Sequence, residues 1–471
     1  MRDSDSNPGK VQQRLKGAPP AFLKDVPDAL HTWLNGRKLD EVECVVADLA
    51  GISRGKAMPI KKFSKKDPLF LPVSIFFQTI TGEYADLTDM ADQWTESDVV
   101  LEPDFSSATA VPWSGDVTMQ IIHDVNYQDG TPVPLSPRNL LKHVINEYQK
   151  CGWTPVVAPE MEFYLTKPNT DPALPIEPPI GRTGRQGISR QAYSMSAVEE
   201  YGTVIDDIYD YAEAQGFEID TIIQEAGSGQ IEINLSHGDP VHLADQVFIY
   251  KRSIREAALK NGCFATFMAK PMQNEPGSAM HIHQSVVETK TGKNVFNTDN
   301  DEPSDLFYGF IGGQQAHLPS VFCMLAPYVN SYRRFVPDDA APINLEWDHD
   351  NRTTGLRIPV SAAANRRVEN RIVGMDCNPY LAIAASLATG LLGMKSATKP
   401  RDPAGIDAYK LSHSLPRSLF EALDLFHADE QINHFFGKPF CSTYSAIKQH
   451  EAEAFLQVIS AWEREHLLLN V

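Results

Sequence analysis

The segment TPVVAPEMEFYL, residues 154–165, decides the fold class because its residues alternate with the period of a β-strand. Apolar residues occupy one face, and Glu160 and Glu162 occupy the other. This pattern predicts a half-buried strand that packs on a core and presents two carboxylates. Alone, such a pair is more often a solvated strand face than a site.

Three more segments alternate in the same way: QEAGSGQIEINL (224–235), GSAMHIHQS (277–285) and RRVENRIV (366–373). They add the ionisable residues Glu225, Glu232, His281, His283 and Glu369. If the four strands share a sheet, five carboxylates and a histidine converge on one surface. Clustered carboxylates raise one another's pKa, and bound divalent cations would relieve the repulsion. An oxygen-rich set with one imidazole favours Mg²⁺ or Mn²⁺ over Zn²⁺.

Seven arginines lie between residues 333 and 371 of this net-acidic chain. They are Arg333, Arg334, Arg352, Arg357, Arg366, Arg367 and Arg371. Guanidinium groups bind phosphate and carboxylate with two parallel hydrogen bonds. Metal ions beside an arginine cluster are typical of phosphoryl transfer. The residues alone therefore indicate Mg²⁺-dependent phosphoryl-transfer or ligase chemistry on an anionic substrate.

The overall composition indicates a folded globular protein rather than a nucleic-acid or membrane protein. The chain has 471 residues, 42% of them apolar, and a net charge of −19. Nucleic-acid binding needs a basic surface, so we expect no nucleic-acid partner. Six cysteines without a CxxC pair indicate a reducing compartment. The apolar stretch Tyr380–Met394 is short for a membrane span, and no secretory signal is evident, so we expect a cytoplasmic protein.

The order of patterns predicts an α+β fold with two domains. We expect a mobile tail over residues 1–20, an N-terminal domain over 21–130 and a larger domain over 131–471. The first domain should contain a helix at 29–34, a strand at 43–48, a turn at 51–55 and strands at 99–101 and 117–123. In the second, Ser136 and Pro137 should begin a helix that Gly152 ends.

The chain resembles the glutamine synthetases in five motifs that occur in the family's order. These are PEMEF, EAGSGQIE, GSAMHIH, NRTTGLRIP, and RRVENR followed by NPYL, and DLAGISRGK near residue 48 resembles the family's N-terminal loop. The resemblance implies an N-terminal β-grasp domain and a catalytic domain with a curved antiparallel sheet. It also implies a homo-oligomer, commonly a dodecamer of two hexameric rings, in which the N-terminal domain of one subunit closes its neighbour's active site.

The resemblance further implies a role for individual residues. One metal would be held by Glu162, Glu225 and Glu232, and the second by Glu160, His281 and Glu369. Arg334, Arg371 and Gly277 would hold glutamate, and Arg352 and Arg357 would stabilise the transferring phosphoryl group. ATP would contact His283, Ser285 and Arg367, and Asp48 would help to bind the ammonium.

The sequence departs from the family at three positions. The flap glutamate that helps to deprotonate ammonium is replaced by Ala340 in VPDDAAP, although Asp338 or Asp339 could serve in its place. Pro276 stands where the family has an asparagine that touches glutamate. His413 stands where adenylylated enzymes have tyrosine, so we expect that regulation to be absent.

Loss of the flap carboxylate favours an alkylamine over ammonium. EINLSHGDP and GSAMHIHQS also look more like the γ-glutamylpolyamine synthetase branch. We therefore expect an ATP-dependent ligase of L-glutamate and a di- or polyamine that acts through γ-glutamyl phosphate. The alternatives are a glutamine synthetase, an enzyme that makes γ-glutamylmethylamide or anilide products, and a non-catalytic ring protein. A metal-dependent hydrolase built on His281 and His283 would need further ligands that the glutamates here make unnecessary.

Overall fold

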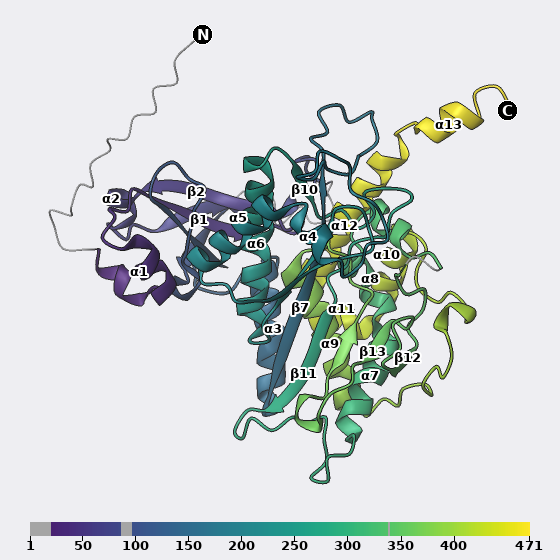
Figure 1. Cartoon of the computed structure of the whole chain (residues 1–471). Helices are drawn as coiled ribbons and strands as arrows, with labels where there is room; N and C mark the ends of the chain where they lie inside the picture. The colour runs from purple at the N-terminus through teal and green to yellow at the C-terminus, as the bar shows by residue number, and fades with distance from the viewer. Residues whose placement is uncertain (1–19, 86–96, 338–339) are drawn as a thin grey trace.

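Figure 1 shows the computed structural model of the chain, in which residues 20–85, 97–337 and 340–471 are described. An N-terminal unit built on one sheet lies beside a larger body built on a second sheet. The predicted mixed α and β class is confirmed. Nearly all of the predicted tail, and both Asp338 and Asp339, lie outside the described residues.

The N-terminal sheet has six strands among the described residues, in the order β2-β1-β6-β4-β3 with β5 paired to β6. The strands β1 and β6 run parallel and the other pairs run antiparallel. The elements of this unit are α1 (Asp28–Leu34), β1 (Glu41–Ala47), β2 (Ser53–Pro59), α2 (Ile60–Phe63), β3 (Leu69–Pro72), β4 (Asp98–Pro103), β5 (Thr109–Ala110) and β6 (Thr118–Asn126).

The turn predicted at residues 51–55 is shorter than expected, because β2 already begins at Ser53. Gly55 is a strand residue that faces Val45 of β1. A Cβ atom at Gly55 would lie 1.9 Å from the carbonyl oxygen of Cys44. This glycine therefore allows close strand pairing and does not form a turn.

The second sheet brings together all four segments that the alternation singled out. Its eight strands, counted over the described ranges, run β12-β13-β14-β11-β7-β9-β8, with β10 paired to β7. Their bounds are β7 (Trp153–Thr166), β8 (Ile219–Gln224), β9 (Gln230–Leu235), β10 (Phe264–Thr266), β11 (Ile282–Glu288), β12 (Trp347–His349), β13 (Leu356–Ile358) and β14 (Val368–Asn370). The sheet is not wholly antiparallel, since β12 and β13 run parallel.

Helices complete the larger body. They are α3 (Pro137–Lys150), α4 (Met195–Glu199), α5 (Gly202–Gln215), α6 (Pro240–Lys260), α7 (Asp305–His317), α8 (Phe322–Leu325), α9 (Pro379–Ser396), α10 (Leu419–Ala428), α11 (Glu430–Phe436), α12 (Lys438–Leu456) and α13 (Ala461–His466). The side chain of Ser136 caps α3 as predicted. Within the described part of the chain, no helix is both long and apolar enough to cross a bilayer.

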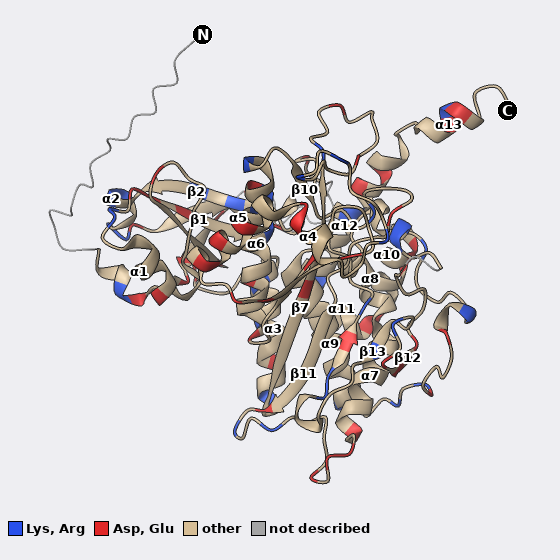
Figure 2. Cartoon of the chain, in the orientation of Figure 1, with Lys and Arg blue, Asp and Glu red and all other residues tan. Residues whose placement is uncertain are grey.

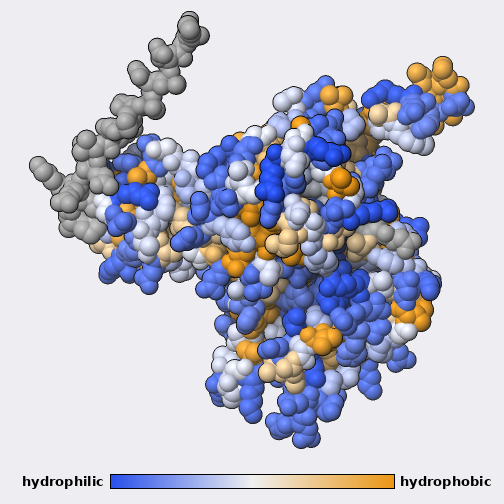
Figure 3. Space-filling model, in the orientation of Figure 1, coloured by the Kyte–Doolittle hydropathy of each residue, from blue (hydrophilic) through white to orange (hydrophobic). Residues whose placement is uncertain are grey.

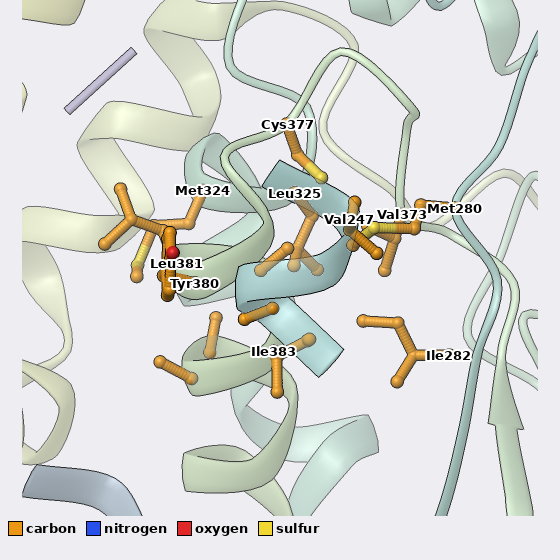
Figure 4. Packing of buried hydrophobic residues seen from close by; sticks show 14 of the residues in the cluster. Val247, Met280, Ile282, Met324, Leu325, Val373, Cys377, Tyr380, Leu381 and Ile383 are labelled. Carbon is orange, nitrogen blue, oxygen red and sulfur yellow. The ribbon is translucent and has the colours of Figure 1, made fainter. Parts of the chain in front are cut away.

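The core lies on the apolar face of the second sheet, against α6 and α9. Figure 4 shows Val247 of α6, Ile282 of β11 and Ile383 of α9 in this packing. The alternating apolar residues of β7 and β9 are fully buried there. Because successive side chains of a strand point to opposite faces, the ionisable residues are left on the other face of the sheet.

A buried arginine joins the two units. Arg138 of α3 donates to both carboxylate oxygens of Asp245 of α6, at 2.9 and 2.8 Å. It also donates to Asp124 of β6 and to Asp104, which follows β4. Only 4% of Arg138 is exposed. The N-terminal sheet is thus held to the helices behind the second sheet by charge-assisted hydrogen bonds.

Two further contacts hold the same interface. Arg252 of α6 forms an ion pair with Glu43 of β1. The side-chain nitrogen of Asn378, the cap of α9, donates to the carbonyl oxygen of Asp48 at 2.9 Å. The loop that carries Asp48 is therefore attached to the larger body of its own chain.

Replacing Arg138 by methionine should lower the free energy of unfolding by about 3–5 kcal/mol, because it leaves the buried Asp245 without its counter-charge. The matched control is Lys150→Met, whose ion pair with Glu147 is exposed on the lysine side and should contribute at most about 1 kcal/mol. Urea unfolding of both variants at one protein concentration measures the difference. Equal losses of unfolding free energy in the two variants would show that Arg138 does not hold the two units together.

Candidate active site

Strand register places the ionisable side chains of the second sheet opposite one another. Glu162 of β7 faces Glu232 of β9. Glu369 of β14 faces His283 of β11 on one side and Arg357 of β13 on the other. The four sequence segments therefore contribute to one surface, as the alternation predicted.

Glu160 is the centre of this cluster. Its carboxylate lies 3.0 Å from Nδ1 of His281 and 2.8 Å from Nε2 of His283. Two groups of three residues have ligand atoms within 4.8 Å of one another: Glu160 with Glu232 and His281, and Glu160 with His283 and Glu369. These groups divide the residues differently from the two sets that the resemblance implied, and those sets remain predictions.

Three of the carboxyl groups have raised pKa values. Burial, reinforced by Glu225, raises the pKa of Glu162 to about 8. Burial and the charges of Glu160, Glu162 and Glu225 raise the pKa of Glu232 to about 9. The pKa of Glu225 is raised as well, mainly by burial. Such groups are costly to ionise together without bound cations, so the donor set fits divalent metal ions.

The other two carboxyl groups are ionised by their neighbours. Burial favours the neutral acid, but Arg371 and the two histidines lower the pKa of Glu369 to about 2. Hydrogen bonds with His281 and His283 outweigh burial and hold the pKa of Glu160 well below its ordinary value. Burial, with Arg371, lowers the pKa of His281 to about 4, which leaves a neutral imidazole suited to metal ligation.

The arginines lie beside the carboxylates. Glu369 accepts from Arg371 at 2.5 Å and from Arg357 at 2.8 Å, and Arg357 also pairs with Asp350 at 2.6 Å. Arg334 is 2% exposed and donates to the carbonyl oxygens of residues 371 and 372.

Gly277 allows the chain to approach Arg334 closely. A Cβ atom there would lie 2.6 Å from Cγ of Arg334 and 2.7 Å from the carbonyl oxygen of Ala269. Since one of these atoms belongs to the backbone, any side chain at this position would displace the arginine or the chain itself.

The five glutamates of the cluster line one cavity of about 590 Å³ together with Arg334, Arg357 and Arg371. Its lining includes the predicted metal residues Glu160, Glu162, Glu225, Glu232, His281 and Glu369, and the predicted substrate residues Gly277, Arg334, Arg352, Arg357 and Arg371. Figure 2 shows acidic residues in red on the ribbon of β7.

A second cavity of about 480 Å³ adjoins the first. It is lined by His283, Ser285 and Arg367, the three residues predicted to contact ATP. Glu160 and Asn234 line both cavities. A ligand in the second cavity would therefore have one end beside the carboxylate cluster.

Asp48 is the one predicted site residue that lines neither of these two cavities. It is fully buried, and its carboxylate accepts from the backbone of Ala50 at 2.9 Å and Ile52 at 2.8 Å and from Arg54 at 2.8 Å. Burial raises its pKa. Within one chain, the carboxylate of Asp48 orders the turn between β1 and β2.

Two of the three positions at which the sequence departs from the glutamine synthetase pattern lie at the first cavity. Ala340 and Pro276 line it. Ala340 has a φ of 63°, in the left-handed region that an alanine rarely adopts. His413 does not line it and lies in the loop between Lys410 and α10.

Gln230, Tyr193 and Tyr409 are among the residues of the first cavity that sequence reasoning did not assign to the site. Gln230 donates to the carbonyl oxygen of Gly277 at 3.0 Å, and its position two residues before Glu232 on the same strand face could have revealed it. Tyr193 and Tyr409 also line the cavity. Both lie outside strands, so no alternation pattern marks them.

The chain is similar to known proteins over most of its length. A profile described as "Glutamine synthetase, catalytic domain" matches residues 134–467. The chain is 33% identical to a γ-glutamylputrescine synthetase of Escherichia coli over 98% of both chains, and 32% identical to a glutamate–isopropylamine ligase of a Pseudomonas species over 92% of this chain and 95% of that one. Among solved structures, ligand-free GmaS matches with a TM-score of 0.78 and 26% identity, over 93% of this chain and 99% of that one.

Metal binding should release protons and should stabilise the protein more at higher pH. The raised pKa values of Glu162 and Glu232 mean that the metal-free fold loses stability as the pH rises from about 5 through 8 and 9, where these groups ionise. A bound cation offsets that loss. The gain in melting temperature on adding Mn²⁺ should therefore grow between pH 6 and pH 9.

The measurement is thermal unfolding with and without Mn²⁺ across this range. For each proton that metal binding releases, the apparent affinity for Mn²⁺ should fall by about tenfold when the pH is lowered by one unit. The variant Glu232→Gln, which has no proton to release at that position, should show a flatter dependence. A gain independent of pH in the unsubstituted protein would contradict the role of these carboxyl groups.

Proposed function

The chain belongs to the glutamine synthetase family and is an ATP-dependent glutamate–amine ligase, and we propose that its amine substrate is a di- or polyamine. The observation that carries the proposal is the pair of adjoining cavities that share Glu160. One is lined by the residues predicted to contact ATP, and the other by carboxylates and arginines suited to metal ions and an anionic acceptor.

The proposed reaction has two steps. The γ-carboxylate of L-glutamate attacks the γ-phosphorus of ATP, so that ADP leaves and γ-glutamyl phosphate forms. The amine then attacks the acyl carbon, the bond to the phosphate oxygen breaks and phosphate leaves. The amine must lose a proton in the second step, and we assign to Asp48 of a neighbouring subunit the binding of the amine before that step.

We assign the residues of the first cavity as the resemblance implied. Glu162, Glu225 and Glu232 would hold one divalent cation, and Glu160, His281 and Glu369 the other, with Mg²⁺ or Mn²⁺ as the metal. Bound there, the cations would neutralise the charge of the phosphates. Arg334, Arg371 and Gly277 would bind glutamate. Arg352 and Arg357 would stabilise the phosphoryl group as it is transferred.

The choice of amine rests on the wall formed by Ala340 and Pro276. An alanine removes both the negative charge and the volume of the family's flap glutamate, which leaves space for the carbon chain of an alkylamine. Two relatives carry names that specify ligation of an alkylamine, putrescine in one case and isopropylamine in the other. The net charge of −19 is compatible with a cationic substrate.

We further propose a ring in which active sites form between subunits. Asp48 does not line the cavity of its own chain, and Arg138, Arg252 and Asn378 hold its domain in place. A neighbouring subunit could present its Asp48 loop to this cavity. The proposed assembly is a dodecamer of two hexameric rings.

The C-terminal segment supports contact between such rings. Residues beyond α12 project away from the body (Figure 1), and Figure 3 shows hydrophobic residues at the tip. Trp462 is 61% exposed and Leu469 is 91% exposed. Large apolar side chains gathered on a projecting segment are typical of a protein interface.

The test of the function is phosphate release with Mg-ATP and L-glutamate, with product masses read for ammonium, methylamine, putrescine, cadaverine and spermidine. We expect γ-glutamyl amides of the diamines and little glutamine. Strong activity with ammonium alone would identify a glutamine synthetase with an unusual flap. Release with none of these amines would contradict the ligase proposal.

The variant Ala340→Glu should shift selectivity toward ammonium. A carboxylate at this position attracts a small cation and fills the space that an alkyl chain needs. We expect the ratio of kcat/KM for putrescine to that for ammonium to fall by about tenfold or more. The matched control is Ala362→Glu, at an exposed position that lines neither cavity. The same ratio in both variants would refute the role given to Ala340.

The double variant Trp462→Ser and Leu469→Ser should separate the proposed dodecamer into hexamers, because it removes apolar surface that the rings would bury between them. Sedimentation velocity measures the mass of the particle. The control Glu465→Ser changes a polar residue of the same segment and should leave the assembly intact. An unchanged mass in the double variant would exclude this segment as the contact.

A further inference from the structure

One wall of the acceptor cavity is built from a segment that a distant loop holds in place. The segment 340–345 begins at the position of the family's flap glutamate, and the loop 407–415 lies against it. Ser414 donates from its backbone to the carbonyl oxygen of residue 343 at 3.0 Å, and its hydroxyl accepts from the backbone of Leu345 at 3.3 Å. The side chain of Asn344 donates to the carbonyl oxygen of Ala408 at 2.8 Å.

These contacts hold residues 343–345, and Tyr409 holds the end of the segment that lies at the cavity. The side chains at 341 and 343–345 are buried, whereas Ala340 is exposed at the cavity. The hydroxyl of Tyr409 donates to the carbonyl oxygen of Ala341 at 3.1 Å. This bond is adjacent to the peptide that follows Ala340, so it restrains the backbone where that residue turns.

The backbone at Ala340 needs such a restraint. With a φ of 63°, its Cβ crowds the backbone in a way that glycine avoids. Conformations of this kind persist only where the surroundings enforce them, and they occur preferentially at functional sites. The strained residue here lies at the position where this chain departs from its family.

Tyr409 is itself well placed to act as a fixed support. It belongs to a short 3₁₀ helix, Ala408–Lys410, whose first turn is capped by Asp407. The residue is half-buried, and it lines the same cavity as Ala340 and Arg334. The side chain of Tyr409 thus lines the cavity that Arg334 also lines, and it is hydrogen-bonded next to the turn at Ala340.

We propose that Tyr409 is a positioning residue for amine selectivity, whose hydroxyl holds the left-handed turn at Ala340 and so fixes the width of the acceptor cavity. The proposal rests on the proposed function, since it requires that the amine reacts in this cavity. It predicts two effects of losing the hydroxyl. The enzyme should discriminate less sharply between amines of different size, and water should reach the acyl phosphate more often.

The second effect has a direct readout. Water that attacks the acyl carbon of γ-glutamyl phosphate breaks the bond to the phosphate oxygen and returns glutamate and phosphate. Phosphate is then released without amide. The molar ratio of phosphate to γ-glutamyl amide therefore measures how well the wall excludes water, whichever amine the enzyme accepts.

The experiment compares Tyr409→Phe, Ala340→Gly and the double variant in the full-length protein. Tyr409→Phe keeps the ring and removes one hydrogen bond, so the kcat/KM ratio between putrescine and ammonium should change by about two- to tenfold. Its phosphate-to-amide ratio should rise. Glycine adopts the left-handed turn without strain, so the same substitution in the Ala340→Gly background should have a smaller effect.

The matched control is Tyr250→Phe. Tyr250 of α6 also donates its hydroxyl to a backbone carbonyl oxygen, that of Ile208 at 3.0 Å, but it lies in the core. This variant should lose stability and keep both ratios. A merely structural role for Tyr409 would move the melting temperature in the same way and leave the ratios unchanged.

The proposal is overturned if Tyr409→Phe leaves both ratios unchanged, if Tyr250→Phe changes them equally, or if the effects of Tyr409→Phe and Ala340→Gly are additive. Failure of the unsubstituted enzyme to ligate putrescine would overturn the proposed acceptor instead. The phosphate-to-amide ratio, measured with any amine that the enzyme does ligate, would still decide the role of Tyr409.

Discussion

The constraint on which this structure depends is the crowding of five carboxyl groups on one face of a sheet. Register alone brings Glu162 opposite Glu232 and places Glu160 between two histidines. Burial then makes full ionisation of the cluster unfavourable, so the fold needs compensating positive charge. Arg357 and Arg371 supply part of it at Glu369, and the remaining groups suit divalent cations. The carboxylates whose mutual repulsion destabilises the metal-free protein are thus the groups that suit the metal ions of phosphoryl transfer.

The apolar faces of the same strands give this cluster its rigidity. Met161 and Phe163 are fully buried on the core side of β7, while their neighbours Glu160 and Glu162 lie in the cavity. A slip of one residue in β7 would exchange the two sets, at the cost of the whole core contact. The packing of α6 and α9 therefore fixes the positions of the carboxylates, although neither helix lines the cavity.

Alternation could predict the four central strands and their ionisable residues because the period of two is a local property of the sequence. It could not predict which carboxylates share a ligand position, since that depends on side-chain directions within the sheet. The family resemblance supplied Arg334 and Gly277, whose contact joins residues far apart in the chain. Nothing in the sequence pattern marks Tyr193 or Tyr409, because loops have no period. The turn predicted at 51–55 extends too far along the chain, because Gly55 lies in a strand and allows close pairing with its neighbour.

The cavity is divided between two kinds of structure, and this division bears on how the enzyme could evolve. The carboxylates that line the cavity lie largely on strands, whose backbone bonds and buried neighbours leave little tolerance for change. Tyr193, Pro276, Ala340 and Tyr409 come from four separate segments outside the sheet. Substitutions there can reshape the wall that we propose faces the amine, one segment at a time, while the carboxylates and arginines of the sheet keep their positions. A lineage with this architecture can acquire a new nitrogen source through a few surface-loop mutations.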